Sequence, residues 1–210
     1  PEVGGMLYGY NDDTYSTSCH DHLEIKALAL RSGDAAPVLM MSFALADFGT
    51  ACCTQTREAV AHECGIPFEH VIASSTHTHS APNCAGQAGW GDVDRPYVDK
   101  FLLPAMLSVS VEAVNRMQPA VIGIGTCESD VGINRREHTR SGHIGLGQNP
   151  WGCFNPKMTV ISFKNDEGRI NNPSTKTGNW VWRIDSNSPF LLFFLPDWKI
   201  FFEIPEVFAT

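Results

Sequence analysis

Two strand-like segments followed by a helix-like segment constrain the fold of this chain more than any other feature. Residues 23–30, LEIKALAL, alternate apolar and polar side chains, and residues 38–45, VLMMSFAL, form a nearly continuous apolar run. Both patterns predict strands. Residues 54–64, TQTREAVAHEC, contain good helix formers and stop at Gly65, before an apolar segment restarts at Val71. The order strand, strand, helix, strand predicts an α/β fold.

The second half of the chain continues this alternation. Residues 97–117 place apolar side chains at helical spacing and predict a helix, whose first turns we expect Pro104 to kink. The segments VIGIG, 121–125, and MTVISF, 158–163, predict two further strands. With 210 residues, 43% of them hydrophobic, the chain is long enough to bury one core. We therefore expect an α/β domain in which helices flank a mixed β-sheet.

Composition excludes several classes of partner. The formal net charge of −8 is spread along the chain and argues against a nucleic acid partner and against an electrostatic membrane anchor. No apolar run approaches the roughly 20 residues of a membrane span, so no transmembrane segment is expected. The seven cysteines are odd in number and lack C-x-x-C spacing, which favours neither a zinc knuckle nor a complete disulfide framework. The chain opens without a signal peptide, so its compartment is left open.

Two histidines one residue apart follow the third predicted strand, in SSTHTHSAPN, residues 74–83. If residues 71–79 are extended, His77 and His79 point to the same face. Ligands of open α/β sheets gather beyond the carboxyl ends of strands. Neutral imidazoles at this spacing suit a divalent metal such as zinc, or one metal ligand plus one acid–base group. The pair is equally compatible with two histidines that have no functional role.

The segment THTHSAP, residues 76–82, resembles the THTHSGP signature of the neutral/alkaline ceramidase family. Four further blocks follow the order of that family: EVGGMLYGY, LEIKALAL, SFALADFG and INRR. The resemblance runs from Glu2 to about Arg169. The chain departs from the family at two places. Ala81 stands where the family has glycine. After Asn134-Arg135 the chain continues with Arg136, whereas characterised ceramidases continue with Ser-Pro.

The resemblance implies a zinc amidase that hydrolyses the N-acyl amide bond of ceramide-like sphingolipids to a fatty acid and a sphingoid base. In such an enzyme Zn²⁺ polarises the amide carbonyl and lowers the pKa of a bound water. By resemblance, His77 is a zinc ligand, His79 serves proton transfer or substrate binding, and Arg135 holds the developing oxyanion. Asp47 would orient an imidazole. Without the resemblance, Arg135 could be a surface charge and Asp47 a helix cap.

The resemblance also implies a ceramide-like lipid substrate, peripheral membrane contact, and a secreted or membrane-associated protein. Residues 1–169 would form the N-terminal portion of the catalytic domain, and residues 170–210 an atypical, irregular tail that proteases cut between about 169 and 187. No histidine follows His143, so the second zinc histidine of the family is absent. We therefore expect an incomplete domain without amidase activity of its own. The alternative is an inactive fragment or paralogue that keeps the scaffold as a binding module.

Other reactive side chains have weaker support. Cys52 and Cys53 suggest a cysteine nucleophile near a helix start, although no signature of a Cys-His enzyme surrounds them. His20 stands near the first histidine position of the family, at a strand entrance where solvated imidazoles are common. Five histidines are expected to be exposed rather than to bind a metal: His20, His22, His62, His138 and His143.

Overall fold

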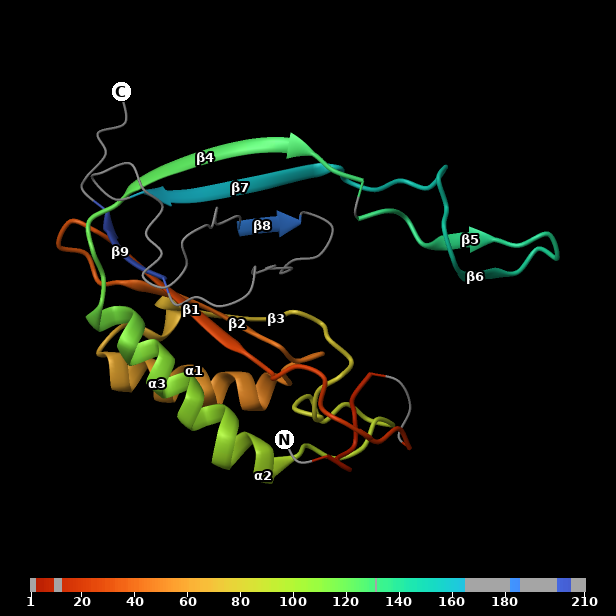
Figure 1. Ribbon diagram of the computed structural model, residues 1–210, viewed down its shortest axis with the longest axis horizontal. Helices are drawn as coiled ribbons and strands as arrows, with labels where there is room; N and C mark the ends of the chain where they lie inside the picture. Colours follow the sequence, from red (N-terminus) through yellow and green to blue (C-terminus); the bar gives the residue numbers. More distant parts are fainter. Residues whose placement is uncertain (1–2, 10–12, 131, 165–181, 186–199, 205–210) are drawn as a thin grey trace.

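A four-stranded mixed sheet forms the centre of the chain (Figure 1). The computed structural model describes residues 3–9, 13–130, 132–164, 182–185 and 200–204. The strand order is β3-β2-β1-β9, and β1 and β2 are antiparallel, whereas β2–β3 and β1–β9 are parallel. The strands are β1 (Ile25–Ser32), β2 (Val38–Phe43), β3 (Val71–Ser75) and β9 (Ile200–Ile204).

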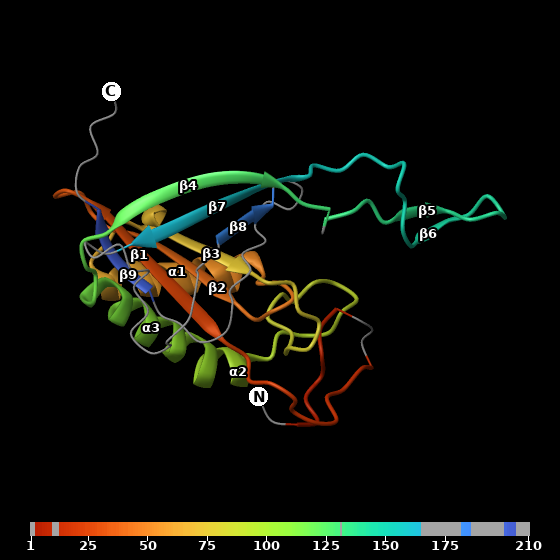
Figure 2. The same cartoon turned by 45° about the horizontal axis from the view of Figure 1, so that its top comes forward.

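Two long helices cover one face of this sheet, as Figures 1 and 2 show. They are α1 (Thr50–Cys64) and α3 (Leu103–Asn115). The main core fills the space between helices and sheet, where apolar side chains from both are fully buried, among them Leu39, Met41, Val60 and Met106. Because alternate residues of a strand share a face, the apolar positions of β1 and β2 that point to the helices form one continuous surface.

The helix predicted over residues 97–117 is divided into three consecutive parts. These are α2 (Arg95–Tyr97), a π-helical turn η2 (Val98–Leu102) and α3, and a short 3₁₀ turn, η1 (Phe68–His70), precedes β3. Pro104 is the second residue of α3, directly after the π turn, and its lack of an N–H interrupts the helical hydrogen bonding at this junction. A π turn therefore lies directly ahead of Pro104, where the kink was expected.

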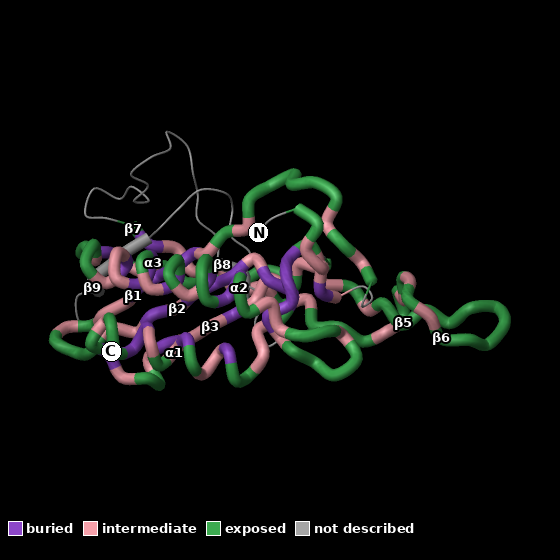
Figure 3. The backbone as a smooth tube through the Cα atoms, turned by 90° about the horizontal axis from the view of Figure 1, so that it is seen from below, coloured by how far each residue is buried: buried purple, intermediate pink, exposed green. Residues whose placement is uncertain are grey.

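A second sheet lies on the other side of the central sheet from α1 and α3 (Figures 1 and 2). It is antiparallel, with the order β4-β7-β8: β4 (Val121–Glu128), β7 (Lys157–Lys164) and β8 (Trp182–Asp185). Between β4 and β7 the chain extends into a separate two-stranded hairpin of β5 (Arg136–His138) and β6 (Ile144–Leu146). Figure 3 shows this hairpin as mostly exposed backbone away from the buried centre.

The expected fold class is confirmed, since the chain has a mixed sheet with helices packed against it. In the tail that was expected to be irregular, the two segments that the structure describes are β8 and β9, which pair with β7 and β1. The rest of 170–210, including most of the predicted cleavage region, lies outside the described residues. Within the described ranges, no helix is both long and apolar enough to cross a bilayer.

Candidate functional site: a histidine pair at the carboxyl edge of the sheet

The loops that follow β2 and β3 meet at one edge of the central sheet. The two strands are parallel neighbours, so their carboxyl ends coincide. The parallel hydrogen bonding continues past the strands, since the Thr76 N–H donates to the carbonyl of Phe43 and the His77 N–H to that of Leu45, each at 2.9 Å. This pairing places the histidine loop beside the loop that contains Asp47.

The extended conformation ends at Ser75, so the alternation expected over residues 71–79 does not reach the histidines. His77 has a φ of 64°, the left-handed region, and is the only described non-glycine residue with a positive φ. Such a conformation is unfavourable for a residue with a Cβ and persists where surrounding contacts impose it, often at functional sites. Here the backbone bond to Leu45 and a side-chain bond hold His77 in place.

The side-chain bond of His77 fixes its tautomer. Nδ1 lies 2.7 Å from the carbonyl oxygen of Ala46, and because a carbonyl only accepts, Nδ1 carries the proton. In the neutral imidazole, Nε2 therefore keeps its lone pair. Metal-binding histidines are commonly oriented in this way, with one nitrogen donating to a carbonyl or carboxylate and the other facing the ion.

Nε2 of His79 faces Nε2 of His77 and lies within hydrogen-bonding distance of it. The two Nε2 atoms are 3.3 Å apart, and the ring centroids are 4.8 Å apart with an interplanar angle of 80°. The N-terminal segment holds the second imidazole, because Gly9 packs so closely that a Cβ there would lie 2.6 Å from Cγ of His79. Gly9 was not singled out from the sequence. Only the EVGGMLYGY block, in which it lies, pointed to this segment.

Asp47 lies next to the pair without a described contact to either imidazole. Its Oδ1 accepts a 2.6 Å hydrogen bond from the Phe48 N–H, and the group that orients His77 is instead the carbonyl of the preceding Ala46.

Burial, with a smaller effect of the Asp47 charge, raises the pKa of the Tyr8 hydroxyl. Tyr8 therefore stays protonated and donates to Gln87 Oε1 at 2.7 Å.

Arg135 and His20 make no described contact with either imidazole of the pair. Arg135 is an exposed residue just before β5, and within the described ranges no hydrogen bond or ion pair joins its guanidinium to His77 or His79. His20 is exposed, as expected, and its Nδ1 lies 2.7 Å from Asp21. It lines a hollow of about 810 Å³ that Thr78 and Ser80 border from the histidine loop.

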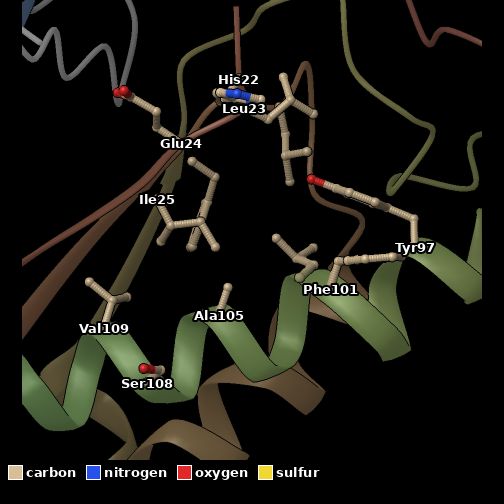
Figure 4. A pocket seen from close by; sticks show the side chains of 13 residues that line it. His22, Leu23, Glu24, Ile25, Tyr97, Phe101, Ala105, Ser108 and Val109 are labelled. Carbon is tan, nitrogen blue, oxygen red and sulfur yellow. The ribbon is translucent and has the colours of Figure 1, made fainter. Parts of the chain in front are cut away.

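A smaller hollow of about 470 Å³ lies between the start of β1, the end of β2 and the helical segment η2–α3 (Figure 4). Its walls are mainly apolar, with Ile25, Phe101 and Val109 facing the space, whereas His22 and Glu24 lie at one end. Neither His77 nor His79 lines either hollow. Neither hollow therefore contains the histidine pair.

The histidine pair fits part of a zinc site. Two ligands of a tetrahedral zinc ion with Zn–N distances of 2.0–2.1 Å are separated by about 3.3–3.4 Å, close to the observed Nε2 separation of 3.3 Å. In the part of the chain that the structure describes, no group of three or more His, Cys, Asp or Glu side chains is arranged to hold a metal ion. The pair supplies one or two ligands, fewer than the three protein ligands usual for a catalytic zinc.

Cys52 and Cys53 lie in the first turn of α1 and have different surroundings. Cys52 is buried, and its sulfur lies 3.6 Å from Nη1 of Arg95. Burial, helped by the Asp47 and Cys52 charges and opposed by Arg57, raises the pKa of Cys53. A raised pKa disfavours the thiolate that nucleophilic catalysis requires.

Two solved structures whose fold resembles this chain are ceramidases. Neutral ceramidase from Pseudomonas aeruginosa matches with a TM-score of 0.62 at 16% identity over 80% of this chain. A ceramidase complexed with C2 matches with a TM-score of 0.63 at 17% identity over the same share. This chain spans only 28% and 27% of those chains, so the similarity concerns a part of the ceramidase fold. No protein-family profile and no curated protein sequence matches the chain.

Proposed function

We propose that this chain forms the N-terminal part of the catalytic domain of a zinc-dependent amidohydrolase that cleaves the N-acyl amide of ceramide-like lipids. One observation carries the proposal: on a ceramidase-like fold, His77 is held by Ala46 with its Nε2 facing that of His79. An imidazole fixed through Nδ1 presents its other nitrogen with little loss of freedom on binding an ion. The left-handed backbone of His77 agrees with a functional role for this residue.

In this proposal each residue has a separate role. His77 would hold zinc through Nε2, and zinc held there would supply Lewis acidity toward the amide carbonyl and an acidified water. His79, beside that nitrogen, moves a proton between water and the leaving amine or binds the substrate. Arg135 would bind the developing oxyanion and Asp47 would support the imidazoles, and these two roles rest on the family resemblance alone.

A second candidate function is a binding module without catalysis. It is favoured by the lack of a third metal-binding side chain near the pair among the described residues. A site with one or two nitrogens holds zinc weakly, because each missing ligand removes part of the binding free energy. On this reading the scaffold and its two hollows are kept for contacts with a ligand or a partner.

Metal binding separates the two candidates. We expect zinc titrated into the purified chain to bind weakly, at one ion per chain, and His77→Ala to weaken this binding by at least about tenfold. His62→Ala, an exposed histidine on α1, is the matched control and should bind as the unmodified chain does. Zinc binding that His77→Ala leaves unchanged, or no zinc binding at all, would favour the binding module.

Amide hydrolysis gives a second measurement. With zinc present, we expect the chain by itself to hydrolyse a fluorescent N-acyl sphingosine no faster than His77→Ala does, since a complete ligand set is lacking among the described residues. Turnover clearly above that of His77→Ala would show that the chain is an active amidase by itself.

A further inference from the structure

Residues 133–154, which we call the arm, project from the rest of the molecule. In Figures 1, 2 and 3 the hairpin of β5 and β6 extends away from both sheets and from the helices. No residue of the arm is buried. Five of its large apolar side chains are exposed: Ile133, Ile144, Leu146, Trp151 and Phe154. The arm thus presents apolar side chains that the folded body does not cover.

Hydrogen bonds within the arm define its shape. The β5–β6 pairing is continued toward the base of the arm, where the Gly147 N–H donates to the Arg135 carbonyl at 3.1 Å and the Asn149 N–H to the Asn134 carbonyl at 2.9 Å. The side chain of Asn134 also donates to the Cys153 carbonyl at 2.9 Å. The exposed side chains are therefore carried by a formed hairpin.

One face of the hairpin combines apolar and basic side chains. The register pairs Arg136 with Leu146 and His138 with Ile144, and residues directly opposite in an antiparallel pair point to the same side. Because successive residues of a strand alternate, all four side chains share one face. Leu146 is 78% exposed and Ile144 is 51% exposed. Two exposed apolar side chains, Ile144 and Leu146, thus lie next to the positively charged Arg136 on one solvent-facing side of the hairpin.

The acidic side chain of the arm belongs to the other face. Glu137 is opposite Gly145, and its carboxylate lies against Gly147, where any Cβ would collide with it. Three arginines and one glutamate give residues 133–154 a formal net charge of +2, in a chain whose net charge is −8. The overall charge, which argued against an electrostatic membrane contact, conceals this local reversal.

A second exposed tip lies beside the hairpin. The Gly152 N–H donates to the Asn149 carbonyl at 3.1 Å, which closes a turn with Pro150 and Trp151 at its centre. The Trp151 side chain is 93% exposed. Tryptophan is enriched where an apolar phase meets water, because its ring is largely apolar and its N–H is polar.

We propose that the arm docks on an anionic phospholipid bilayer, with Ile144, Leu146 and Trp151 entering the interface and Arg136, on the same face as Leu146, contacting phosphate groups. Charge complementarity supports this partner, since the basic arm meets the anionic surface first. The acidic remainder of the chain lies farther from the bilayer than the arm does. Because physiological salt screens charges beyond about 8 Å, its repulsion of the anionic surface is weakened. The choice of a lipid surface, but not the composition of the arm, rests on the proposed function, whose substrate is a membrane lipid.

Vesicle flotation tests this proposal on the whole chain without substrate or zinc. We expect binding to vesicles of 70% phosphatidylcholine and 30% phosphatidylserine, weaker binding to pure phosphatidylcholine, and weakening by added salt. The double variant Leu146→Asn/Trp151→Ala should bind the anionic vesicles at least about tenfold more weakly. Ile124→Asn, at a 71% exposed strand position on β4, is the matched control and should bind normally.

Several results would overturn the proposal. They are a lack of binding to anionic vesicles, equal binding by the double variant, and equal loss with Ile124→Asn. Self-association in sedimentation that the double variant abolishes, without vesicle binding, would assign the arm to a second copy of the chain. Because flotation requires no metal, vesicle binding without zinc binding would overturn only the proposed function. Zinc binding at His77 without vesicle binding would overturn only the role of the arm.

Discussion

The helix-covered sheet and the arm use the same backbone pairing but differ in what lies behind it. In the sheet, β2 is paired on both sides and carries side chains such as Leu39 and Met41, which are almost entirely inaccessible to solvent. In the arm, two three-residue strands pair only with each other, and no residue is buried (Figure 3). Isolated two-stranded hairpins are marginally stable in water. The difference indicates that burial of apolar side chains stabilises the sheet, whereas the arm exposes side chains suited to the proposed contact with a bilayer.

The largest expected effect compares two leucines. Leu39→Ala removes a side chain with 0% exposure and should lower the free energy of unfolding by about 2–5 kcal/mol, because it leaves a cavity. Leu146→Ala, on the arm, should change it by less than about 0.5 kcal/mol. Urea unfolding followed by circular dichroism measures both values. Similar losses for the two variants would show that the arm is packed in solution.

Alkaline pH should lower the stability of the buried core that covers the central sheet, and it should leave the arm unaffected. Burial, followed by the nearby Cys52 and Asp94 charges, raises the pKa of Cys84 to about 12. A folded-state pKa above the unfolded value means stability that is complete below the unfolded pKa and is lost as pH rises. With the ordinary value of 9.0 for the unfolded chain, the loss from Cys84 is about 2 kcal/mol at pH 10.5.

Two cysteine variants measure this contribution. Urea unfolding under reducing conditions at pH 8 and 10.5 should show a smaller loss of stability for Cys84→Ala than for the unmodified chain. Cys153→Ala, at an exposed position of the arm, should retain the full loss. Burial, followed by the Cys84 and Asp94 charges, also raises the pKa of Tyr97 to about 12. Tyr97 therefore adds a loss of stability of the same sign in all three proteins. An unchanged pH dependence in Cys84→Ala would contradict the assignment.

A pair of glycines tests how the body positions the candidate site. Gly9 and Gly4 both have positive φ angles, 110° and 95°, but a Cβ at Gly4 meets nothing within 4 Å, whereas one at Gly9 meets the His79 ring. Both alanine variants should lose about 1–2 kcal/mol from backbone strain. Only Gly9→Ala should also shift the His79 ring resonances in NMR spectra. Identical spectra for the two variants would show that Gly9 does not hold His79.

The smallest effect is expected at the tip of the arm. Trp151→Ala should leave the free energy of unfolding within about 0.5 kcal/mol, since the side chain is almost fully exposed. Urea unfolding without lipid measures this value. A loss above about 1 kcal/mol would mean that Trp151 packs against the protein in solution, and it would remove the tryptophan from the proposed bilayer contact.

Local patterns predicted the elements that have strong periodicity. The apolar runs of β1, β2, β4 and β7 and the helical segment of α1 were found within a few residues of their observed ends. The strands β5 and β6 were missed because segments of three residues, here REH and IGL, are too short to show a periodicity. The strand β9 pairs with β1 from a distant part of the chain, and no local pattern specifies such a partner.

The sequence by itself determined the α/β class, the position of the two histidines beyond a strand, and the resemblance that agrees with the ceramidase-like fold. Only the tertiary structure decided how these histidines meet. The carbonyl of Ala46, which orients His77, is a backbone group that every residue has, so no residue type marks it. The contact of Gly9 with His79 joins segments 70 residues apart in the sequence. Such positions are fixed by packing between segments, and a pattern read along one segment contains no information about the distance to another.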